Sequence, residues 1–254
     1  MDQKNLEKNP TIDIIIPVYN SANYIDQTLQ SILQQDYKNY KVFIVNDCSS
    51  DNLKDKIKKY KNLIKIINLK KNKGPAFCRN LGIRYSKSEY ISFLDSDDFW
   101  DKYKLSKHIK FMTKYNLDFS YTNYISISEN GQIRKKITVQ NISNFNQFIK
   151  NTSIATSTMI IRRSSMSNLK FKKKGYGFDD YIFKAELLKK KINTQHFNEF
   201  LTYYRIRKKS ISSNPLRNIL WVWKINKNYF NFKFFFNLKS LFFIIINSIK
   251  KYYR

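Results

Sequence analysis

The first hundred residues alternate short apolar runs with segments whose apolar residues recur at helical spacing. The apolar runs cover 11–19, 41–45, 64–69 and 90–94. Runs of this length suit strands that are buried on both faces, and strands separated by helices predict βαβ units with a mainly parallel sheet. Right-handed crossovers then bring the carboxyl ends of all four strands to one edge. The pattern therefore predicts a Rossmann-like α/β fold, a mainly parallel central sheet flanked by helices.

Four loops that are distant in sequence should converge at that edge. They are PVYN (17–20), NDCSSD (46–51), NKGPAFCRN (72–80) and DSDD (95–98). Open α/β sheets bind their ligands at this edge. The loops carry polar and charged side chains where a simple connection needs only small residues. We therefore expect the functional site there.

The middle of the chain is less regular. Apolar spacing predicts a helix over 101–115, and short strands are expected within 118–140, with a turn at Asn130-Gly131. A further strand is expected over 156–163. The segment 181–191 has the pattern of an amphipathic helix.

Three carboxylates, Asp95, Asp97 and Asp98, follow the fourth apolar run. Two carboxylates about 4 Å apart repel by roughly 4 kcal/mol at an effective dielectric near 20, so protonation, a cationic side chain or a metal must offset the repulsion. Mg²⁺ and Mn²⁺ suit such a site, since they take one or two carboxylates together with substrate phosphates and water. The alternative is that Asp97 or Asp98 caps a helix beginning near Phe99, which leaves Asp95 unexplained.

In this order and spacing, PVYN, VNDCSSD, GPAFCRNLGI and FLDSDD resemble inverting family 2 glycosyltransferases, which have the GT-A nucleotide-sugar fold. The resemblance is close over 11–100 and weaker beyond. It implies a GT-A-like domain over 11–214, with a nucleotide-sugar-binding half (11–100) and an acceptor-side half (101–214). A basic, aromatic, helical extension (215–254) follows as a membrane-associating tail.

The resemblance implies roles for the first three loops. Pro17 and Tyr19 would line the nucleotide pocket with the Tyr19 ring against the base, and Asn20 of the same loop would bind substrate. Asp47 would accept hydrogen bonds from the uracil edge, and Arg79 would lie near the base or the diphosphate. The alternatives are core packing for Tyr19, an Asx-turn for Asp47 and a surface charge for Arg79.

In the fourth loop, Asp95 and Asp97 would form the Asp-X-Asp pair that binds the donor and the metal. Asp97 would lie most directly on the metal, and Asp98 would support the pair. The segment YYRIRKKSISSN (203–214) resembles a family segment that usually reads Tyr-Arg-X-His, and Arg207 stands where His is common. Arg207 would reach phosphate as a cation, but it cannot ligate a metal.

The segment GFDDYIFKAELL (177–188) resembles the Glu-Asp segment of the family, which opens a helix facing the sugar. An inverting transfer needs a group that takes the proton of the acceptor hydroxyl, and a positioned base contributes about 10²–10⁴-fold. The resemblance makes Asp180 this base and Asp179 its substrate-binding neighbour. Capping and dipole complementation are the alternative. His108 and His196 are expected to be structural or surface residues.

The segment 215–254 differs in composition from the rest of the chain. From Phe200 onward there is no Asp or Glu, and Lys and Arg mix with aromatic residues. This suits a helix in the headgroup layer of an anionic membrane, with Trp221 and Trp223 at the interface. The alternative is a pair of helices packed on the preceding domain. No apolar stretch approaches the ~20 residues needed to cross a bilayer.

The net charge of the chain also bears on whether its partner is a membrane or a nucleic acid. The chain carries 47 Lys and Arg against 19 Asp and Glu, a formal net charge of +28. The excess points to nucleic acid or to an anionic membrane surface, and the codon bias of an AT-rich genome is another explanation. We expect no nucleic-acid partner, because no recognised binding motif is present and two acidic clusters would repel phosphates without a metal.

We therefore expect a metal-dependent inverting glycosyltransferase that uses Mn²⁺ or Mg²⁺. It would move a sugar from a nucleotide-sugar, a UDP-sugar by resemblance, to a growing surface glycan or a lipid-linked acceptor. The N-terminus lacks a signal-peptide apolar region, and Cys48 and Cys78 are typical of free thiols in a reducing compartment. We thus expect a cytoplasmic enzyme, peripheral on the inner face of the cell membrane.

Three other classes remain as alternatives. The first is a nucleic-acid-binding protein, which would bind RNA in a salt-sensitive way and ignore nucleotide sugars. The second is a nucleotidyltransferase, which normally has a glycine-rich loop after its first strand, whereas PVYN has no glycine. The third is an inactive homologue that acts as an assembly partner.

Overall fold

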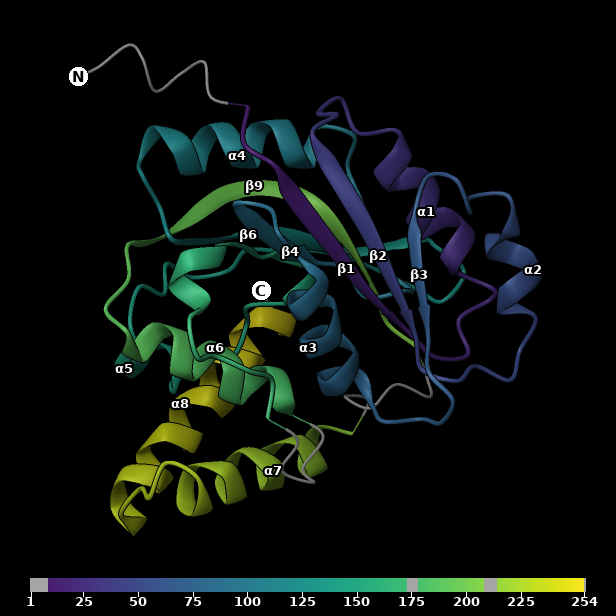
Figure 1. Cartoon of the computed structure of the whole chain (residues 1–254). Helices are drawn as coiled ribbons and strands as arrows, with labels where there is room; N and C mark the ends of the chain where they lie inside the picture. Colours follow the sequence, from purple (N-terminus) through teal and green to yellow (C-terminus); the bar gives the residue numbers. More distant parts are fainter. Residues whose placement is uncertain (1–8, 173–177, 208–213, 254) are drawn as a thin grey trace.

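The computed structural model describes residues 9–172, 178–207 and 214–253. Within them the chain forms one nine-stranded sheet with helices on both faces (Figure 1). The strand order is β3-β2-β1-β4-β8-β6-β9-β5, and β7 pairs with β6 outside this path. The sheet with its flanking helices confirms the α/β class predicted from the sequence.

The first half of the sheet is parallel, as predicted from the alternating pattern. β1 pairs in parallel with both β2 and β4, and β2 pairs in parallel with β3. The elements of this half are β1 (Ile12–Val18), α1 (Ile25–Leu33), β2 (Tyr40–Asn46), α2 (Leu53–Lys58), β3 (Lys65–Asn68), α3 (Pro75–Tyr85) and β4 (Tyr90–Phe93).

The second half mixes strand directions. β8 runs antiparallel to β4 and β6, while β9 runs parallel to β6 and antiparallel to β5. Its elements are β5 (Phe99–Trp100), α4 (Lys104–Lys114), β6 (Phe119–Ile127), β7 (Ile133–Ile137), α5 (Phe145–Phe148), η2 (Thr156–Thr158), β8 (Ile160–Arg162), η3 (Arg163–Met166), α6 (Asp179–Lys189) and β9 (Thr194–Arg205). The strand expected over 156–163 is instead the 3₁₀ turn η2 followed by the short β8. The sequence pattern also missed β9, the longest strand.

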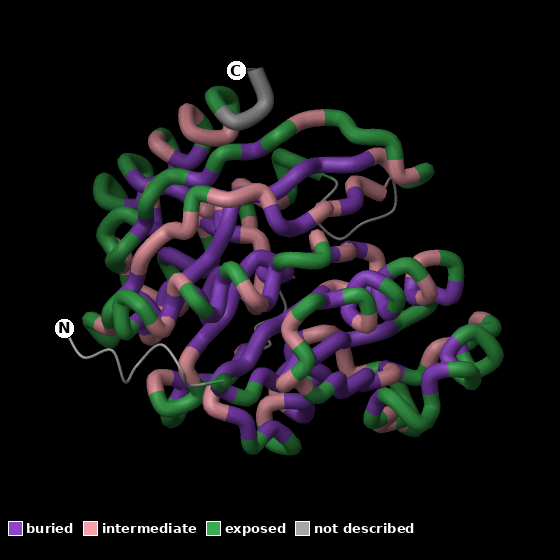
Figure 2. The backbone as a smooth tube through the Cα atoms, turned by 90° about the horizontal axis from the view of Figure 1, so that it is seen from above, coloured by how far each residue is buried: buried purple, intermediate pink, exposed green. Residues whose placement is uncertain are grey.

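Two hydrophobic clusters lie on opposite faces of the sheet, and β1 divides its side chains between them. Ile12, Ile14 and Ile16 pack with α1, α2 and α4, while Ile15 faces the cluster containing α3 and α6. Figure 2 shows the buried strands at the centre and exposed residues along the outer helices. On the α3 face, Gly82 approaches so closely that a Cβ there would lie 2.4 Å from Ile15 Cγ2.

The tail forms two helices, α7 (Pro215–Asn228) and α8 (Phe234–Tyr253); in Figure 1 α7 lies at the bottom, and α8 rises from there past α6. Val222, Ile225, Leu241 and Ile244 are buried and join the cluster that contains α6. The alternative of two helices packed on the domain is therefore what the structure has. The helix predicted over 181–191 is confirmed as α6, but its amphipathic character is wrong, because apolar and polar residues alike are buried along most of its length.

Among the described residues, no helix combines the length and the apolarity that a transmembrane helix requires.

Candidate active site

The first two loops are joined through Asn20, which lies just after β1 with a left-handed backbone (φ 48°). Its side-chain Oδ1 accepts the Ser50 N–H at 2.9 Å, and its own N–H donates to Ser49 Oγ at 3.1 Å. Tyr19 is 50% exposed beside it, so the core-packing alternative for Tyr19 is wrong. Pro17 is buried within β1, opposite Val45 of β2. Of Pro17 and Tyr19, only Tyr19 therefore has an exposed side chain.

Asp47 connects the second loop to the third. Its carboxylate is 3% exposed, and its oxygens accept the backbone N–H groups of Lys73 and Gly74 at 2.7 and 2.8 Å. Both oxygens thus hold the loop before α3. The uracil contact expected of Asp47 stays a prediction.

Arg79 on α3 points into the protein beside the acidic loop. It is 7% exposed, so the surface-charge alternative is wrong, and its Nη2 donates to Asp95 Oδ1 at 2.5 Å. Burial lowers the Arg79 pKa, but the carboxylates of Asp95, Asp180 and Asp179 outweigh burial and raise it. Its Nε is buried without a hydrogen-bond partner among the described residues. Arg79 is thus a fixed cation with an unused donor.

Asp97 lies between a carboxylate and a cation. Burial and then the charge of Asp95 raise its pKa, while the Arg207 guanidinium opposes this rise. Arg207 Nη1 donates to Asp97 Oδ2 at 3.0 Å, and its guanidinium lies 5.1 Å from the centre of the Tyr24 ring. Each acid of the predicted Asp-X-Asp pair therefore has its own arginine.

Asp98 is buried (1% exposed) and holds neighbouring strands together. Its Oδ1 accepts the backbone N–H of Arg205 in β9 at 2.8 Å, and its Oδ2 accepts the Ser157 hydroxyl at 2.6 Å. Burial, followed by the charges of Asp97 and Asp95, raises its pKa well above the ordinary value. The residues after it form β5, so the helix-capping alternative is wrong.

Asp180 lies in the first turn of α6, preceded by Asp179. Its Oδ2 accepts hydrogen bonds from Lys184 Nζ at 2.7 Å and from Thr156 Oγ1 at 3.2 Å. Burial pushes its pKa up, but Lys184, then Arg79 and Thr156, together hold it below the ordinary value. The helix starts after Phe178 without a side-chain cap, so capping does not account for the Asp180 carboxylate.

The turn η2 brings the two acidic groups together. Ser157 accepts the Asp95 N–H at 3.1 Å and donates to Asp98, while the adjacent Thr156 binds Asp180. No local motif marks these residues, because the run around them has the composition of an ordinary strand. Ser157, Thr156 and Lys184 are therefore the site residues that the sequence did not reveal.

The two histidines lie outside this cluster, as expected. His108 is fully buried in α4 with Nδ1 2.9 Å from Lys104 Nζ, and burial holds its pKa well below the ordinary value. His196 contacts Asn123 at 2.8 Å. Both thiols are free, Cys48 exposed and Cys78 buried.

The described residues contain no group of three or more His, Cys, Asp or Glu side chains that could hold a metal ion. Asp95 and Asp97, whose side chains are 31% and 21% exposed, are therefore the carboxylates available to a cation. Burial and then the charge of Asp95 raise the Asp97 pKa, and a divalent ion beside the pair would offset both effects. Mg²⁺ and Mn²⁺ need only one or two carboxylates when phosphates complete the shell, so the residues fit such an ion.

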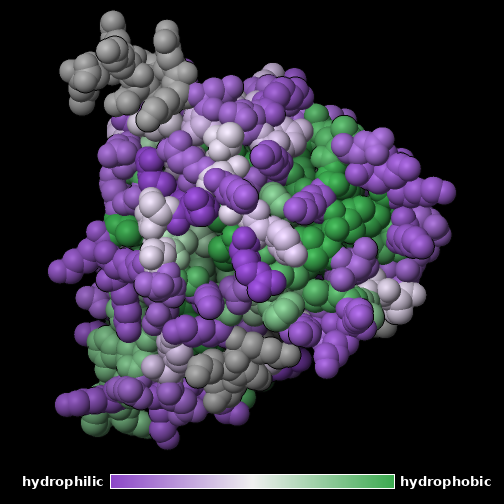
Figure 3. Space-filling view, viewed as in Figure 1, coloured by the Kyte–Doolittle hydropathy of each residue, from purple (hydrophilic) through white to green (hydrophobic). Residues whose placement is uncertain are grey.

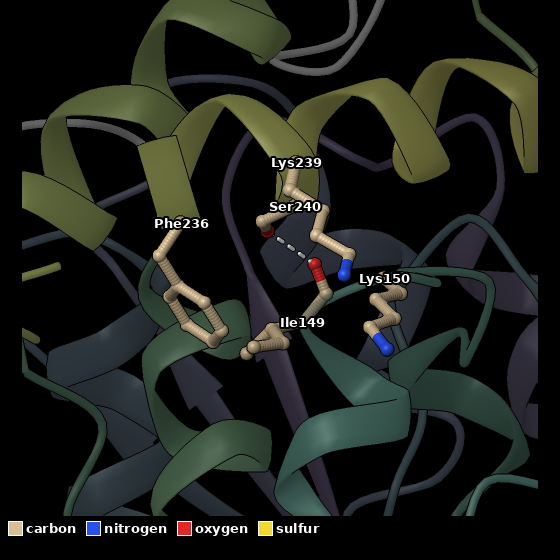
Figure 4. Close-up of a pocket in the computed structure, with 5 residues that line it drawn as sticks. All are labelled: Ile149, Lys150, Phe236, Lys239 and Ser240. Atoms are coloured by element: carbon tan, nitrogen blue, oxygen red, sulfur yellow. Dashed lines mark hydrogen bonds between the residues drawn. The ribbon is translucent and has the colours of Figure 1, made fainter. Parts of the chain in front are cut away.

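Hollows are found beside the second loop and beside the tail. A groove of about 730 Å³ runs beside α2 and β3 from Asn46 and Ser49 of the second loop, within the size range of ligand pockets. The second is a cavity of about 60 Å³ between α8 and the end of α5, where Ser240 Oγ donates to the Ile149 carbonyl (Figure 4). The 60 Å³ cavity is too small for a nucleotide, and the residues that line the groove do not include Tyr19, Arg79, Asp95 or Asp97, so neither hollow defines the donor site.

Comparison with known proteins identifies the family. The model of "Glycosyl transferase family 2" matches residues 13–170, which include the four loops. The chain belongs to this family. It is therefore a glycosyltransferase, as the resemblance predicted.

Among its relatives is UDP-Glc:alpha-D-GlcNAc-diphosphoundecaprenol beta-1,3-glucosyltransferase WfaP of Escherichia coli. That protein is 34% identical over 243 residues, which cover 95% of each chain. Among solved structures, S. aureus TarS 1–349 in complex with UDP-GlcNAc has a TM-score of 0.72 at 20% identity, and the match covers 94% of this chain and 73% of the 1–349 chain.

A second structural neighbour is the mannosyltransferase PcManGT from Pyrobaculum calidifontis, in complex with GDP-Man and Mn²⁺. Its TM-score is 0.69 at 14% identity, and the match covers 89% of this chain and 66% of that one. These structural likenesses confirm a GT-A-like fold for the family 2 chain.

Proposed function

We propose that this family 2 glycosyltransferase is a metal-dependent inverting enzyme that transfers a sugar from a UDP-sugar to a lipid-linked or growing surface glycan. The observation that carries the proposal is the joining of two acidic groups by one turn. Ser157 of η2 binds Asp95 and Asp98, and Thr156 binds Asp180. The same short segment thus fixes a candidate donor site and a candidate base.

Asp180 is suited to act as the base. Its Oδ2 is engaged by Lys184 and Thr156, and the described residues provide no hydrogen bond to Oδ1. With its pKa held low, the carboxylate is ionised at neutral pH. The acceptor oxygen would bond to the anomeric carbon as that carbon's bond to the diphosphate breaks. The hydroxyl proton goes to Asp180, and the electron pair of the broken bond leaves with the diphosphate.

Arg79 and Arg207 would bind the leaving diphosphate, since both lie beside the Asp95–Asp97 pair and guanidinium groups match phosphate oxygens. Asp95 and Asp97 would hold Mn²⁺ or Mg²⁺, with Asp97 the more direct ligand. When bound, such an ion stabilises negative charge on the departing diphosphate. In the structure Arg207 holds Asp97, so we expect this ion pair to loosen when donor and cation bind.

The donor and acceptor classes are proposed from relatives. WfaP is named for UDP-Glc and for a diphosphoundecaprenol acceptor, and TarS is solved with UDP-GlcNAc. Tyr19, half exposed beside the second loop, would stack on the base. A lipid-linked acceptor lies in a membrane, so the enzyme needs access to a bilayer surface.

The outward face of α8 offers a membrane contact. Its exposed apolar side chains recur at spacings of three and four residues, which places them on one stripe of the helix. The stripe consists of Phe235, Leu238, Phe242, Ile245 and Ile249, between 39% and 81% exposed. In Figure 3 hydrophobic atoms gather at the lower left, over the region of α7 and α8.

The positive charges on and beside α8 favour an anionic membrane as the partner of the stripe. The whole segment from residue 200 onward has no acidic residue, while Lys233, Lys239 and Lys250 lie on or beside α8. Anionic lipids attract each nearby lysine by about 1 kcal/mol. We therefore propose that α8 docks on an anionic membrane at the inner face of the cell membrane, with no acidic residue of its own to oppose binding.

Titration calorimetry with UDP, with and without Mn²⁺, tests the site together with two variants. Asp97→Asn should lose the Mn²⁺-dependent part of UDP binding, because it removes a charged ligand of the cation. Asp180→Asn should bind UDP normally and lose transfer by about 10²–10⁴-fold. Near-normal turnover by Asp180→Asn would rule out the base assignment, and Mn²⁺-independent UDP binding by the unmodified chain would rule out the metal.

A further inference from the structure

Lys184 lies beside the proposed base and is almost completely buried. It is 3% exposed, and its Nζ donates to Asp180 Oδ2 and to the Ile154 carbonyl, each at 2.7 Å. A buried ammonium is costly unless it is paired and hydrogen-bonded. An apolar side chain would fill this helix position at less cost, so the position is unusual in a helix that is otherwise packed with apolar residues.

The geometry around Asp180 explains what Lys184 does. Lys184 is one turn along α6 from Asp180, and the second donor, Thr156, comes from η2. Two donors from different elements hold Oδ2 and restrict rotation of the carboxylate. The other oxygen, Oδ1, is thereby given a fixed direction, and the carboxylate side chain remains 32% exposed.

Lys184 also provides the largest favourable charge at Asp180. Burial by itself raises the Asp180 pKa, and Lys184 is the first contributor that lowers it, ahead of Arg79 and Thr156. Arg79 is shared, because its guanidinium is bonded to Asp95. The neighbouring Asp179 is the other ionisable group at the start of α6. Lys184 is thus the cation dedicated to this carboxylate.

We propose that Lys184 is a positioning residue for the glycosyl transfer, holding Asp180 so that Oδ1 faces the acceptor hydroxyl. The inference rests on the proposed function, in which Asp180 is the base. Lys184 acts through Asp180 and touches neither the sugar nor the diphosphate. Its loss should therefore change the turnover number and its pH dependence, while UDP binding stays as it is.

The test compares Lys184→Met with Lys189→Met in the full chain. Lys189 is on the exposed end of the same helix, over the rings of Phe145 and Phe230, and serves as the matched control. Misplacing a reacting group by about 1 Å costs about 10²-fold, so kcat of Lys184→Met should fall by about that factor. Without the lysine the Asp180 pKa rises, and the acidic limb of the kcat profile should move to higher pH.

Further variants separate the possible results. Lys184→Arg, which keeps the charge, should retain the acidic limb of the unmodified chain. Adding Lys184→Met to Asp180→Asn should cause no further loss if Lys184 works through Asp180. UDP titration of each variant shows that it is folded.

The results for Asp180→Asn and Lys184→Met together distinguish a failure of the Lys184 role from a failure of the proposed function. If Asp180→Asn loses transfer but Lys184→Met keeps the rate and the acidic limb of the unmodified chain, the role of Lys184 is refuted and the base assignment stands. If Asp180→Asn turns over normally, the proposed function itself fails. A Lys184→Met loss that is equal at every pH also overturns the inference, because a purely structural role would produce it.

Discussion

The outward stripe of α8 provides the most quantitative test of membrane docking. Phe235 is 81% exposed and Phe242 is 59% exposed. Burying a whole phenylalanine side chain is worth about 2 kcal/mol. Scaled by the exposed fractions, full insertion of these two rings contributes about 1.6 and about 1.2 kcal/mol. Replacing both with serine should weaken vesicle binding by about 3 kcal/mol, roughly 100-fold.

The assay is co-sedimentation of the full chain with vesicles that contain an anionic lipid, compared with zwitterionic vesicles at low and moderate salt. Salt should weaken the lysine contribution, since charges at the surface are screened, and it should leave the phenylalanine contribution in place. Leu63→Ser is the matched control. Leu63 has the same exposed fraction as Phe242, 59%, and follows α2 on the opposite side of the molecule (Figure 1).

Three results would contradict membrane docking through the stripe on α8. One is tight anionic-vesicle binding by Phe235→Ser/Phe242→Ser that equals binding by the unmodified chain. Another is an equal loss in the Leu63→Ser control. The third is a chain that self-associates through α8 and ignores vesicles, with the double variant becoming monomeric in sedimentation velocity. That result would assign the stripe to a second copy of the chain.

Two further predictions concern the framework that holds the site. Gly82→Ala places a Cβ 2.4 Å from Ile15 Cγ2, and overpacking of this kind costs about 1–3 kcal/mol. Calorimetry should show a lower Tm, partly restored by a smaller residue at position 15, and an unchanged Tm would mean that α3 moves freely on β1. Ser157→Ala removes the hydroxyl that binds buried Asp98, at a cost of about 1–3 kcal/mol. Urea unfolding measures that loss, and the same variant should show weaker UDP binding because Asp95 also loses its contact with Ser157. Unchanged stability and UDP binding would contradict the role given to η2.

The sequence predicted the first half of the fold because its strands are buried on both faces and appear as continuous apolar runs. β9 was missed for the opposite reason. Its residues alternate irregularly between buried and half-buried along its length, and its register to β6 shifts near Asn123. A strand without a regular apolar period has no signal of the kind that marked β1.

The same contrast applies to the site. The acids were found because charged residues at a strand end are unexpected. Their partners were not found, because Ser157 and Thr156 lie in a run that resembles a strand. Lys184 looked like the polar side of an amphipathic helix. Its burial and its bond to the Ile154 carbonyl are seen only in the folded chain, and such contacts between distant segments have no local pattern.

The packing of α7 and α8 on the cluster that contains α6 determines how the membrane proposal has to be tested. Removing the tail would delete Val222, Ile225, Leu241 and Ile244, and so expose the apolar side chains of the cluster that they join. It would also break a chain of hydrogen bonds, in which Tyr181, the neighbour of Asp180, donates to Asn226 of α7, and Asn226 donates to Asn237 and Ser240 of α8.

A truncated chain that failed to bind vesicles or to transfer sugar could therefore have lost the α6 environment instead of a lipid contact. Substitutions confined to the outward stripe leave those buried contacts intact. Because surface changes away from the core usually alter stability by less than about 0.5 kcal/mol, Phe235→Ser/Phe242→Ser should keep the Tm and the UDP affinity of the unmodified chain. If both are kept, any fall in transfer to a vesicle-embedded acceptor, with transfer to a detergent-dispersed acceptor preserved, must come from lost docking.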